Sequence, residues 1–562
     1  MKLITKYMAA AAVAVTAVSC SDFLDMTPTD SVSDKVIWEN TENAEMAVNY
    51  IYSYTYDVLM NQCLAGLTES LTDMMKYGSY NYNSLCFIPS EIAYGDETTL
   101  TASYVDTYLG YWSSWYGAIR RCNEALYNLD NYGKMSSGDK IRLEGEIRFM
   151  RAYLYFDLVK RYKKVILYDR DLAAISKDKA LSSEKDCWNF ILDDLKYAAD
   201  KLPAKANAGG RIDKGMAYAF ITRSMLYAAN GMEAAGQDPK PYYEAVIEAA
   251  DEVSDLGYDL AGNYADSYST VGNQEVILQY LFSRADDVTH SFDYYYTPGG
   301  DYSIHGQKGG GYGTPTQEMV ESYELATGGF PDWSEWHGET TNIPPYELLE
   351  PRFQATVLYN GAPWKGRTIE SYVGGADGYC EWNVDPEPNG RSTTGYFLRK
   401  IVDENHDVIK YSSGTQPLSI IRYAEVLLNQ AEALFKTGDE VNAEKLVNRI
   451  RARVGLPAVS VEGSALWAAL RQERKVELSY EGLWYWDLRR WGVAHKAYPE
   501  GLTGYQVHGL KITKDADTGE FTYKYVSVDD KDRNFPQKLY RFPLPSSELR
   551  SNSLVDQFPE WK

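Results

Sequence analysis

The sequence predicts an all-α fold, and helical periodicity is the observation that carries this prediction. Residues 140–162 place apolar side chains at helical spacing, with charged side chains between them: Ile147, Met150, Leu154 and Leu158. Pairs of helical segments with short connections occur twice further along the chain, at 213–230 with 241–256 and at 423–436 with 440–454. Helices joined by such short connections are expected to pack side by side.

Start and stop signals place the individual elements along the chain. Residues 41–130 indicate helices, interrupted by a Tyr/Asn/Gly/Ser loop from Tyr77 to Ser84. A helix is expected at 183–201, because Pro203 cannot continue it. Pro241 suits the first turn of a helix, where the missing N–H has no partner to lose, and Gly257 suits the end of one.

The pair at 423–454 resembles a tetratricopeptide unit. Small and bulky residues fall near the characteristic positions of that repeat: Ala431, Leu434, Gly438, Ala443 and Val447. Small residues let two helices approach closely, and large residues fill the space between neighbouring units. We therefore expect stacked helix pairs in a helical scaffold over about 30–280 and 415–495.

Two regions lack this periodicity. Residues 285–415 are rich in Gly, Tyr, Trp and Pro, and residues 495–545 are similar, with a short strand expected at 521–526. Irregular segments of this length in a compact chain usually carry function. We therefore predict that these insertions form a loop-rich ligand-binding face.

The first nineteen residues predict a lipoprotein signal peptide. Lys2 and Lys6 precede an uncharged run from Met8 to Ser19, which is too short to span a bilayer. Cys20 follows directly, so we expect cleavage of residues 1–19 and acylation of Cys20, which would anchor the protein to a membrane. No later segment is long and apolar enough to suggest another span.

Charge and cysteine content narrow the function classes. The formal net charge is −23, whereas nucleic-acid-binding domains are basic, so the sequence disfavours nucleic acid as a partner. Anionic membrane surfaces are disfavoured for the same reason.

The chain has six cysteines without a C-x-x-C spacing, and we expect buried thiols, with a Cys63–Cys86 bridge left open.

The sequence predicts a protein that is not an enzyme. It contains no nucleophile elbow, phosphate-binding loop, zinc-protease motif or calcium-binding loop, and its six histidines are scattered. We therefore assign no catalytic residue, no metal site and no cofactor. Glycoside hydrolysis needs only two carboxylates, so a hydrolase stays as an alternative that release of reducing sugars would reveal.

Several segments resemble motifs of the SusD/RagB family. The clearest is the helix that contains Arg148-Phe149-Met150-Arg151-Ala152, and the segments occur in the family order. They are 20–28, 147–159, 417–428, 447–453, 473–492 and 542–549. The tail at Gln557-Phe558-Pro559 departs from the usual family ending.

This resemblance implies a single SusD-like domain over 20–562, built on tetratricopeptide units. It also implies a lipid-anchored protein at the cell surface of the outer membrane. Such a protein captures an oligosaccharide or polysaccharide and delivers it to a SusC-like TonB-dependent transporter. We expect the charged residues of the motif helices to form buried or half-buried ion pairs, since buried charges are tolerated only when paired: Arg148, Arg151, Arg422, Glu425, Glu477 and Asp487.

Aromatic rings on loops are the candidate ligand contacts. A sugar ring can stack one face on an aromatic side chain, while amide groups bind its hydroxyls. Two regions supply such side chains, and the candidates are Tyr80, Asn81, Tyr82, Asn83, Tyr294, Tyr296, Trp333 and Trp336. Core packing or contact with the transporter is the alternative role for each ring.

Two other functions fit the same architecture. A peptide-capturing member of the family would have a charged, less aromatic site. A tetratricopeptide scaffold without a small ligand would leave the central Tyr/Trp loops without a purpose.

Overall fold

The computed structural model describes residues 34–59, 67–77, 84–172, 178–206, 209–382 and 390–562. The predicted signal peptide, Cys20 and the candidates Tyr80, Asn81, Tyr82 and Asn83 lie outside the described residues. So does Cys63 of the open disulfide, whereas Cys122, Cys187 and Cys380 are buried thiols. Within the described ranges, no helix has the length and hydropathy of a membrane span.

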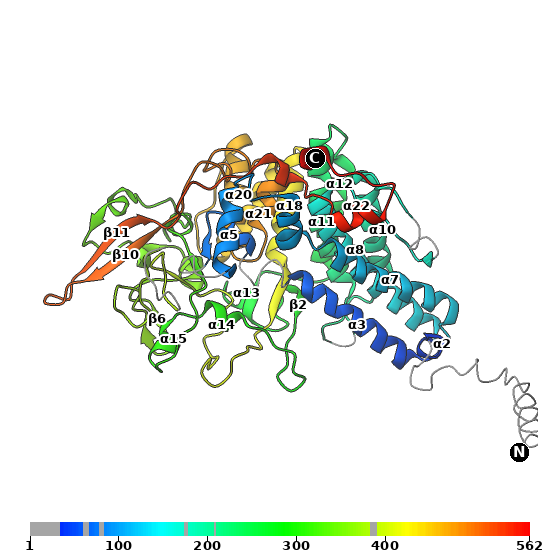
Figure 1. Ribbon diagram of the computed structural model, residues 1–562, viewed down its shortest axis with the longest axis horizontal. Helices are drawn as coiled ribbons and strands as arrows, with labels where there is room; N and C mark the ends of the chain where they lie inside the picture. The colour runs from blue at the N-terminus through cyan, green and yellow to red at the C-terminus, as the bar shows by residue number, and fades with distance from the viewer. Residues whose placement is uncertain (1–33, 60–66, 78–83, 173–177, 207–208, 383–389) are drawn as a thin grey trace, which may run out of the picture.

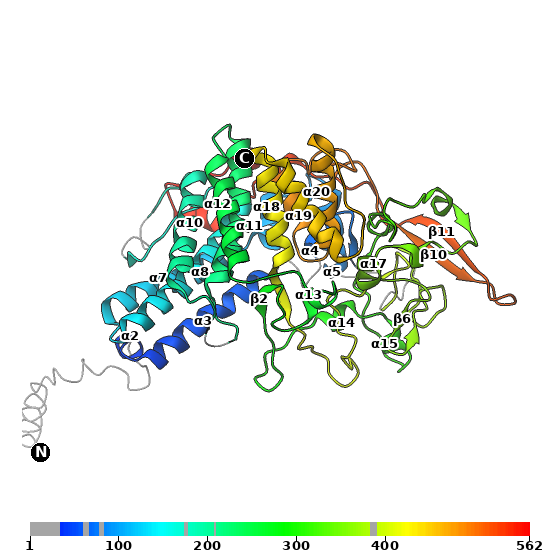
Figure 2. The same ribbon diagram turned by 180° about the vertical axis from the view of Figure 1, so that it is seen from behind.

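Long helices form most of the scaffold and extend from the centre of the molecule to one side (Figures 1 and 2). They are α3 (Thr41–Leu59), α5 (Ser84–Tyr94), α7 (Trp112–Tyr132), α8 (Ser137–Tyr162), α10 (Glu184–Lys201), α11 (Lys214–Ala234), α12 (Lys240–Asp255), α18 (Tyr423–Thr437), α19 (Glu440–Arg453) and α20 (Gly463–Glu477). Helix α8 packs against α3, α7, α10 and α11, and nearly all of its second half is buried. The predicted helices at 140–162, 183–201 and in the two pairs are therefore confirmed.

Capping residues explain where these helices begin. Ser136 and Ser183 accept hydrogen bonds from the backbone N–H groups three residues later, at 3.1 Å in each case. Asp213 does the same for α11 and Asp439 for α19. Each side chain satisfies an N–H that has no partner inside the helix. Gly438 ends α18 with a φ of 92°, a conformation that favours glycine.

The helix pairs stack as the tetratricopeptide resemblance predicts. Helix α11 packs on α12, α12 on α18, and α18 on α19 and α20. Ala431, Val447 and Leu470 meet in a small buried cluster between α18, α19 and α20. The small side chain of Ala431 lets these helices approach, and the two larger side chains fill the space.

Short elements follow in the less regular parts of the chain. The helical turns are α2 (Asp34–Trp38), α4 (Leu67–Ser70), α6 (Ala102–Val105), η3 (Asp106–Gly110), α13 (Asp266–Ser269), α14 (Phe292–Tyr296), α15 (Gly300–Ser303), α16 (Gln317–Val320), η4 (Ser334–His337), η5 (Tyr346–Leu348), α17 (Pro351–Thr356), α21 (Trp484–Arg490), η6 (Gln537–Tyr540), α22 (Ser546–Ser551) and η7 (Pro559–Trp561).

The all-α prediction is wrong in one respect, because the described part of the chain also forms five small antiparallel sheets. Their strands are β1 (Met75–Tyr77) with β3 (Gly313–Pro315), β2 (Val276–Tyr280) with β9 (Leu418–Arg422), β5 (Val357–Leu358) with β8 (Phe397–Leu398), β6 (Pro363–Trp364) with β7 (Arg367–Thr368), and β10 (His508–Lys514), β11 (Phe521–Ser527) and β4 (Glu339–Thr340). The strand expected at 521–526 is confirmed as β11. Apart from β10, the other strands have five residues or fewer, which is too short to give a clear two-residue alternation in sequence.

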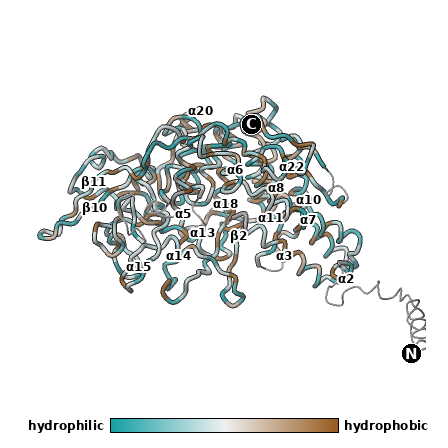
Figure 3. The backbone as a smooth tube through the Cα atoms, in the orientation of Figure 1, coloured by the Kyte–Doolittle hydropathy of each residue, from teal (hydrophilic) through white to brown (hydrophobic). Residues whose placement is uncertain are grey.

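The sheets and loops gather at the opposite side of the molecule from α7 and α10 (Figure 1). The β10–β11 hairpin projects from this side, and hydrophilic residues occupy its tip (Figure 3). Strand β9 continues directly into α18, and its partner β2 leads towards α14. The β2–β9 sheet therefore connects the helical scaffold to the irregular face.

Candidate functional site

Four tyrosines from three chain segments form a ring cluster on the irregular face, here called the tyrosine cluster. Tyr294 and Tyr295 belong to α14, Tyr302 to α15, and Tyr312 follows a run of glycines. The ring planes of Tyr294 and Tyr312 are inclined by 30° to each other, with centroids 6.5 Å apart. Tyr295 meets both of them edge-on at 5.2 Å, and Tyr302 meets Tyr294 at 6.2 Å.

Exposure decides which of these rings a ligand can reach. Tyr294 is 36% exposed, Tyr295 and Tyr312 are half-buried, and Tyr302 is buried beneath them. The buried ring supports the exposed one, so the cluster has the geometry of a stacking platform. Loops positioned by a rigid scaffold are where binding residues concentrate.

Backbone hydrogen bonds hold the glycine run against α14. The N–H of Gly310 donates to the carbonyl of Tyr294 at 3.2 Å, and the N–H of Tyr312 donates to Tyr295 at 2.9 Å. Gly310 has a φ of 73°, and a Cβ there would lie 2.1 Å from the carbonyl oxygen of Thr297. This close approach requires glycine, so the glycine run is a fixed part of the site.

The β1–β3 sheet places the end of β1 beside the tyrosine cluster. Tyr77 pairs with Gly313, which directly follows Tyr312 of the tyrosine cluster. Residues 78–83 continue from Tyr77 and contain four of the candidate ligand contacts, and their positions lie outside the described residues. Strand β1, the last described element before residue 78, therefore ends next to the glycine run.

A buried aspartate connects α15, which carries Tyr302, to neighbouring segments through charged side chains. Asp301 accepts hydrogen bonds from Thr297 at 2.6 Å, Lys365 at 2.9 Å and Arg367 at 2.8 Å. Burial alone would raise the pKa of Asp301, but Lys365 and the other donors outweigh it and hold the pKa below its usual value. Asp301 therefore stays ionised and ties α15 to the β6–β7 hairpin.

A histidine links α14 to the loop before β9. The Nδ1 of His406 lies 2.5 Å from the Oδ2 of Asp293, and its Nε2 lies 3.0 Å from the carbonyl oxygen of Tyr411. Both ring nitrogens face acceptors, so the protonated ring is favoured, and the pKa of His406 is raised chiefly by its bond to Asp293. His290 is close by, and burial lowers its pKa.

The structure separates the four candidates that it describes. Tyr294 is in the tyrosine cluster and Trp336 is half-buried in η4, with its Nε1 donating to Asn342 at 3.0 Å. Tyr296 is 1% exposed and packs against Phe292 in the core. Trp333 is 6% exposed. The burial of Tyr296 and Trp333 favours core packing, the alternative role for these rings, over ligand contact.

Position along α14 explains why Tyr294 and Tyr296 differ in exposure. Residues two apart on a helix point about 200° away from each other, so Tyr294 faces outward when Tyr296 faces the core. Tyr295, Tyr302 and Tyr312 were not predicted as contacts. The signal that could have found Tyr312 is its place in a five-residue stretch with four glycines, where the backbone can approach a neighbouring segment closely.

Comparison with known proteins identifies the fold. A family model described as the SusD family matches residues 274–561, which is more than half of the chain. The chain belongs to the SusD family. A second model, described as starch-binding associating with outer membrane, matches residues 22–226.

SusD-like relatives match this chain over nearly its whole length. A SusD-like protein of Bacteroides ovatus is 24% identical, and the match covers 99% of this chain and 98% of the relative. The crystal structure of a SusD-like protein from Bacteroides fragilis has a TM-score of 0.77 at 28% identity, covering 95% of this chain and 99% of that one. A laminarin binding SusD-like protein has a TM-score of 0.60 at 21% identity, covering 93% and 100%. These descriptions concern binding and association rather than catalysis.

The SusD-like motif residues form buried ion pairs, as the sequence predicted. Their partners are Asp194 for Arg148 and Arg151, Arg223 for Glu425, and Arg474 and Arg490 for Asp487. Arg148 is half-buried and the others are buried. Since each charge is paired, these residues hold the scaffold together and are unavailable to a ligand.

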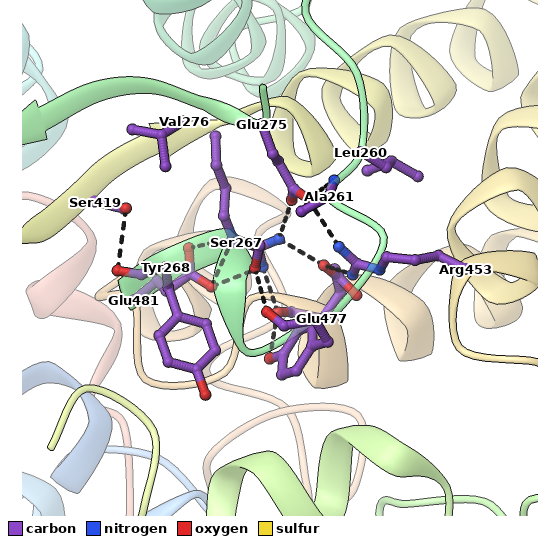
Figure 4. Close-up of polar contacts among 12 residues, drawn as sticks. Leu260, Ala261, Ser267, Tyr268, Glu275, Val276, Ser419, Arg453, Glu477 and Glu481 are labelled. Carbon is purple, nitrogen blue, oxygen red and sulfur yellow. Dashed lines mark hydrogen bonds and ion pairs between the residues drawn. The ribbon is translucent and has the colours of Figure 1, made fainter. Parts of the chain in front are cut away.

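The largest of these ion-pair groups joins the β2–β9 sheet to the last scaffold helices (Figure 4). The Nη1 of Arg422 lies 2.7 Å from Glu275 and 2.6 Å from Glu477, and its Nη2 lies 2.8 Å from Glu481. Arg453 contacts Glu275 and Glu477 as well. We call these five residues the arginine–glutamate cluster.

Electrostatics keep this cluster ionised. Burial alone would raise the pKa of Glu477, but Arg453, Arg422 and Arg352 hold it well below its usual value. Within the described residues, no group of three or more His, Cys, Asp or Glu side chains is arranged to hold a metal ion.

Proposed function

We propose that this chain is a cell-surface lipoprotein that captures an oligosaccharide or polysaccharide and delivers it to a SusC-like TonB-dependent transporter. The observation that carries the proposal is the tyrosine cluster of a SusD-family fold, with Tyr294 exposed and backed by a buried ring. Aromatic faces suit the C–H faces of sugars. The laminarin-binding neighbour with the same fold supports a glycan as the ligand class.

Residues 78–83 and Trp336 extend the proposed site. The amides of Asn81 and Asn83 would bind hydroxyl groups, while Tyr80 and Tyr82 would add rings beside Tyr312. The β1–β3 pairing supports this arrangement, because residue 78 follows the strand that pairs with Gly313. Trp336 would add a ring at a second position on the irregular face.

A glycan array tests the capture function directly. The purified protein is applied to the array, and binding of each hit is measured by isothermal titration calorimetry. We expect saturable binding to at least one class of neutral glycan, weakened by Tyr294→Ala. Binding to peptides with no binding to any glycan would overturn the proposal in favour of peptide capture, and release of reducing sugars would favour a hydrolase.

The anchor and the partner need separate experiments. We propose that Cys20 is acylated after removal of residues 1–19, so native protein should incorporate labelled palmitate and Cys20→Ala should not. Affinity purification of the native protein from outer membranes should recover a TonB-dependent transporter. Recovery of the protein without lipid from a soluble fraction, with no transporter, would contradict this part of the proposal.

A further inference from the structure

A cavity lies in the helical scaffold, between α3, α8 and the β2–β9 sheet. Its volume is about 410 Å³, which falls within the usual range for small-molecule sites. It shares no lining residue with the tyrosine cluster. We call it the α3–α8 pocket.

The α3–α8 pocket has a buried floor and an exposed rim. Phe149 and Tyr153 of α8 are 1% and 5% exposed and form part of the floor, together with Ile420 of β9. Asn49 of α3 is exposed at the rim, and Gln279 of β2 is half-buried in the wall. Ring side chains therefore lie inside, and amide side chains lie nearer to solvent.

The hydroxyl groups of two lining tyrosines, Tyr52 and Tyr280, form hydrogen bonds with other protein groups. The hydroxyl of Tyr52 donates to Glu146 at 2.9 Å and accepts from the N–H of Ile212 at 3.0 Å. The hydroxyl of Tyr280 donates to Thr55. Because both hydroxyls bond to the protein, each ring is held in place where it lines the cavity, and neither hydroxyl needs a ligand to satisfy it.

Charge in the α3–α8 pocket is neutralised before any ligand enters. Arg211 is the single charged side chain of the lining, and its Nη2 and Nε lie 2.6 Å and 3.2 Å from the buried carboxylate of Glu146. Its Nη1 donates to the Oδ1 of Asn49 at 2.8 Å. These bonds fix the rim and leave no unpaired charge, which favours an uncharged ligand.

Two amide groups remain for hydrogen bonding. In the described part of the chain, the Nδ2 of Asn49 has no hydrogen-bond partner. The Oε1 of Gln279 has none either, and its Nε2 makes one long contact of 3.5 Å with Ser419. The α3–α8 pocket therefore combines fixed ring surfaces, one amide donor and one amide acceptor.

We propose that the α3–α8 pocket binds one or two pyranose units of a neutral carbohydrate, at a site separate from the tyrosine cluster. A pyranose presents a C–H face to the rings and hydroxyl groups to Asn49 and Gln279. A charged sugar or a carboxylate ligand would find no counter-charge there. This second site would hold a chain end or a short oligosaccharide against the scaffold.

Saturation-transfer NMR on the full chain tests this proposal. The probes are the methyl glycosides of glucose, galactose, mannose and xylose, and the variants are Asn49→Trp, which blocks the rim, and Gln279→Ala, which removes one amide. Tyr50→Trp is the matched control, because Tyr50 is the next residue on α3 and its side chain is 57% exposed. Melting temperatures confirm that every variant is folded.

We expect at least one glycoside to receive saturation from the native protein and from Tyr50→Trp. The signal should fall in Asn49→Trp, because only the tyrosine cluster can then bind the glycoside, and Kd at the α3–α8 pocket should rise about three- to tenfold in Gln279→Ala, as loss of one hydrogen bond implies. Absence of transfer to all four glycosides, or unchanged transfer in folded Asn49→Trp, would overturn the proposal. Because Tyr294 does not line the α3–α8 pocket, either result leaves the test of the tyrosine cluster intact.

Discussion

Replacing Tyr294 by alanine is the sharpest perturbation of the proposed glycan site. The side chain is 36% exposed, which for an aromatic residue leaves roughly 70 Å² of ring surface open to a ligand. Covering that area with a sugar face contributes about 1.8 kcal/mol at about 25 cal/mol per Å². We therefore expect Tyr294→Ala to raise Kd about 20-fold.

Calorimetry with a glycan selected on the array measures this change. Tyr294→Phe keeps the ring and should bind within about twofold of the native protein. Tyr50→Ala is the matched control, because Tyr50 is also an exposed tyrosine but lies on α3, outside the cluster. If folded Tyr294→Ala binds as tightly as the native protein, the stacking argument is refuted.

Three further predictions concern stability. Glu477→Gln removes the negative charge that three arginines share. It should lower the free energy of unfolding, measured by urea titration, by about 3–5 kcal/mol. A loss below about 1 kcal/mol would contradict the stabilising role of the arginine–glutamate cluster. Trp333→Ala should cost about 3–5 kcal/mol, because the ring is buried, and should leave glycan affinity unchanged in the folded protein; weaker binding without destabilisation would restore Trp333 as a ligand contact. The raised pKa of His406 means that its bond to Asp293 stabilises the folded state fully below the unfolded pKa of about 6.5, and less as pH rises through the folded pKa. The stability difference between native protein and His406→Gln should therefore shrink from pH 6 to pH 8, and a constant difference would count against this ion pair.

Local signals were enough to predict much of the scaffold. The helix expected at 140–162 spans Ser137–Tyr162, because apolar spacing and a serine cap act within a few residues. The buried role of Arg151 and Asp487 was also predictable, since charges in an otherwise apolar helix must be paired. Their partners were not, because Asp194 and Arg474 lie 43 and 13 residues away along the chain.

The sequence indicated the region that carries the candidate site, but it identified only some of the residues in that site. Composition pointed to 285–415, and the tyrosine cluster lies there. Composition could not distinguish Tyr294 from Tyr296, because a helix of five residues gives no periodicity to read. Backbone bonds from Gly310 to Tyr294 and from Tyr312 to Tyr295 bring the rings of Tyr294 and Tyr312 together, and such contacts are set by tertiary packing rather than by local sequence.

A crystal structure of the protein with a bound oligosaccharide would test the central claim most directly. The account predicts a sugar ring in van der Waals contact with the exposed ring of Tyr294, flanked by Tyr312 and by side chains from residues 78–83. Density for the oligosaccharide at other places alone, with the Tyr294 ring left open to solvent, would contradict it.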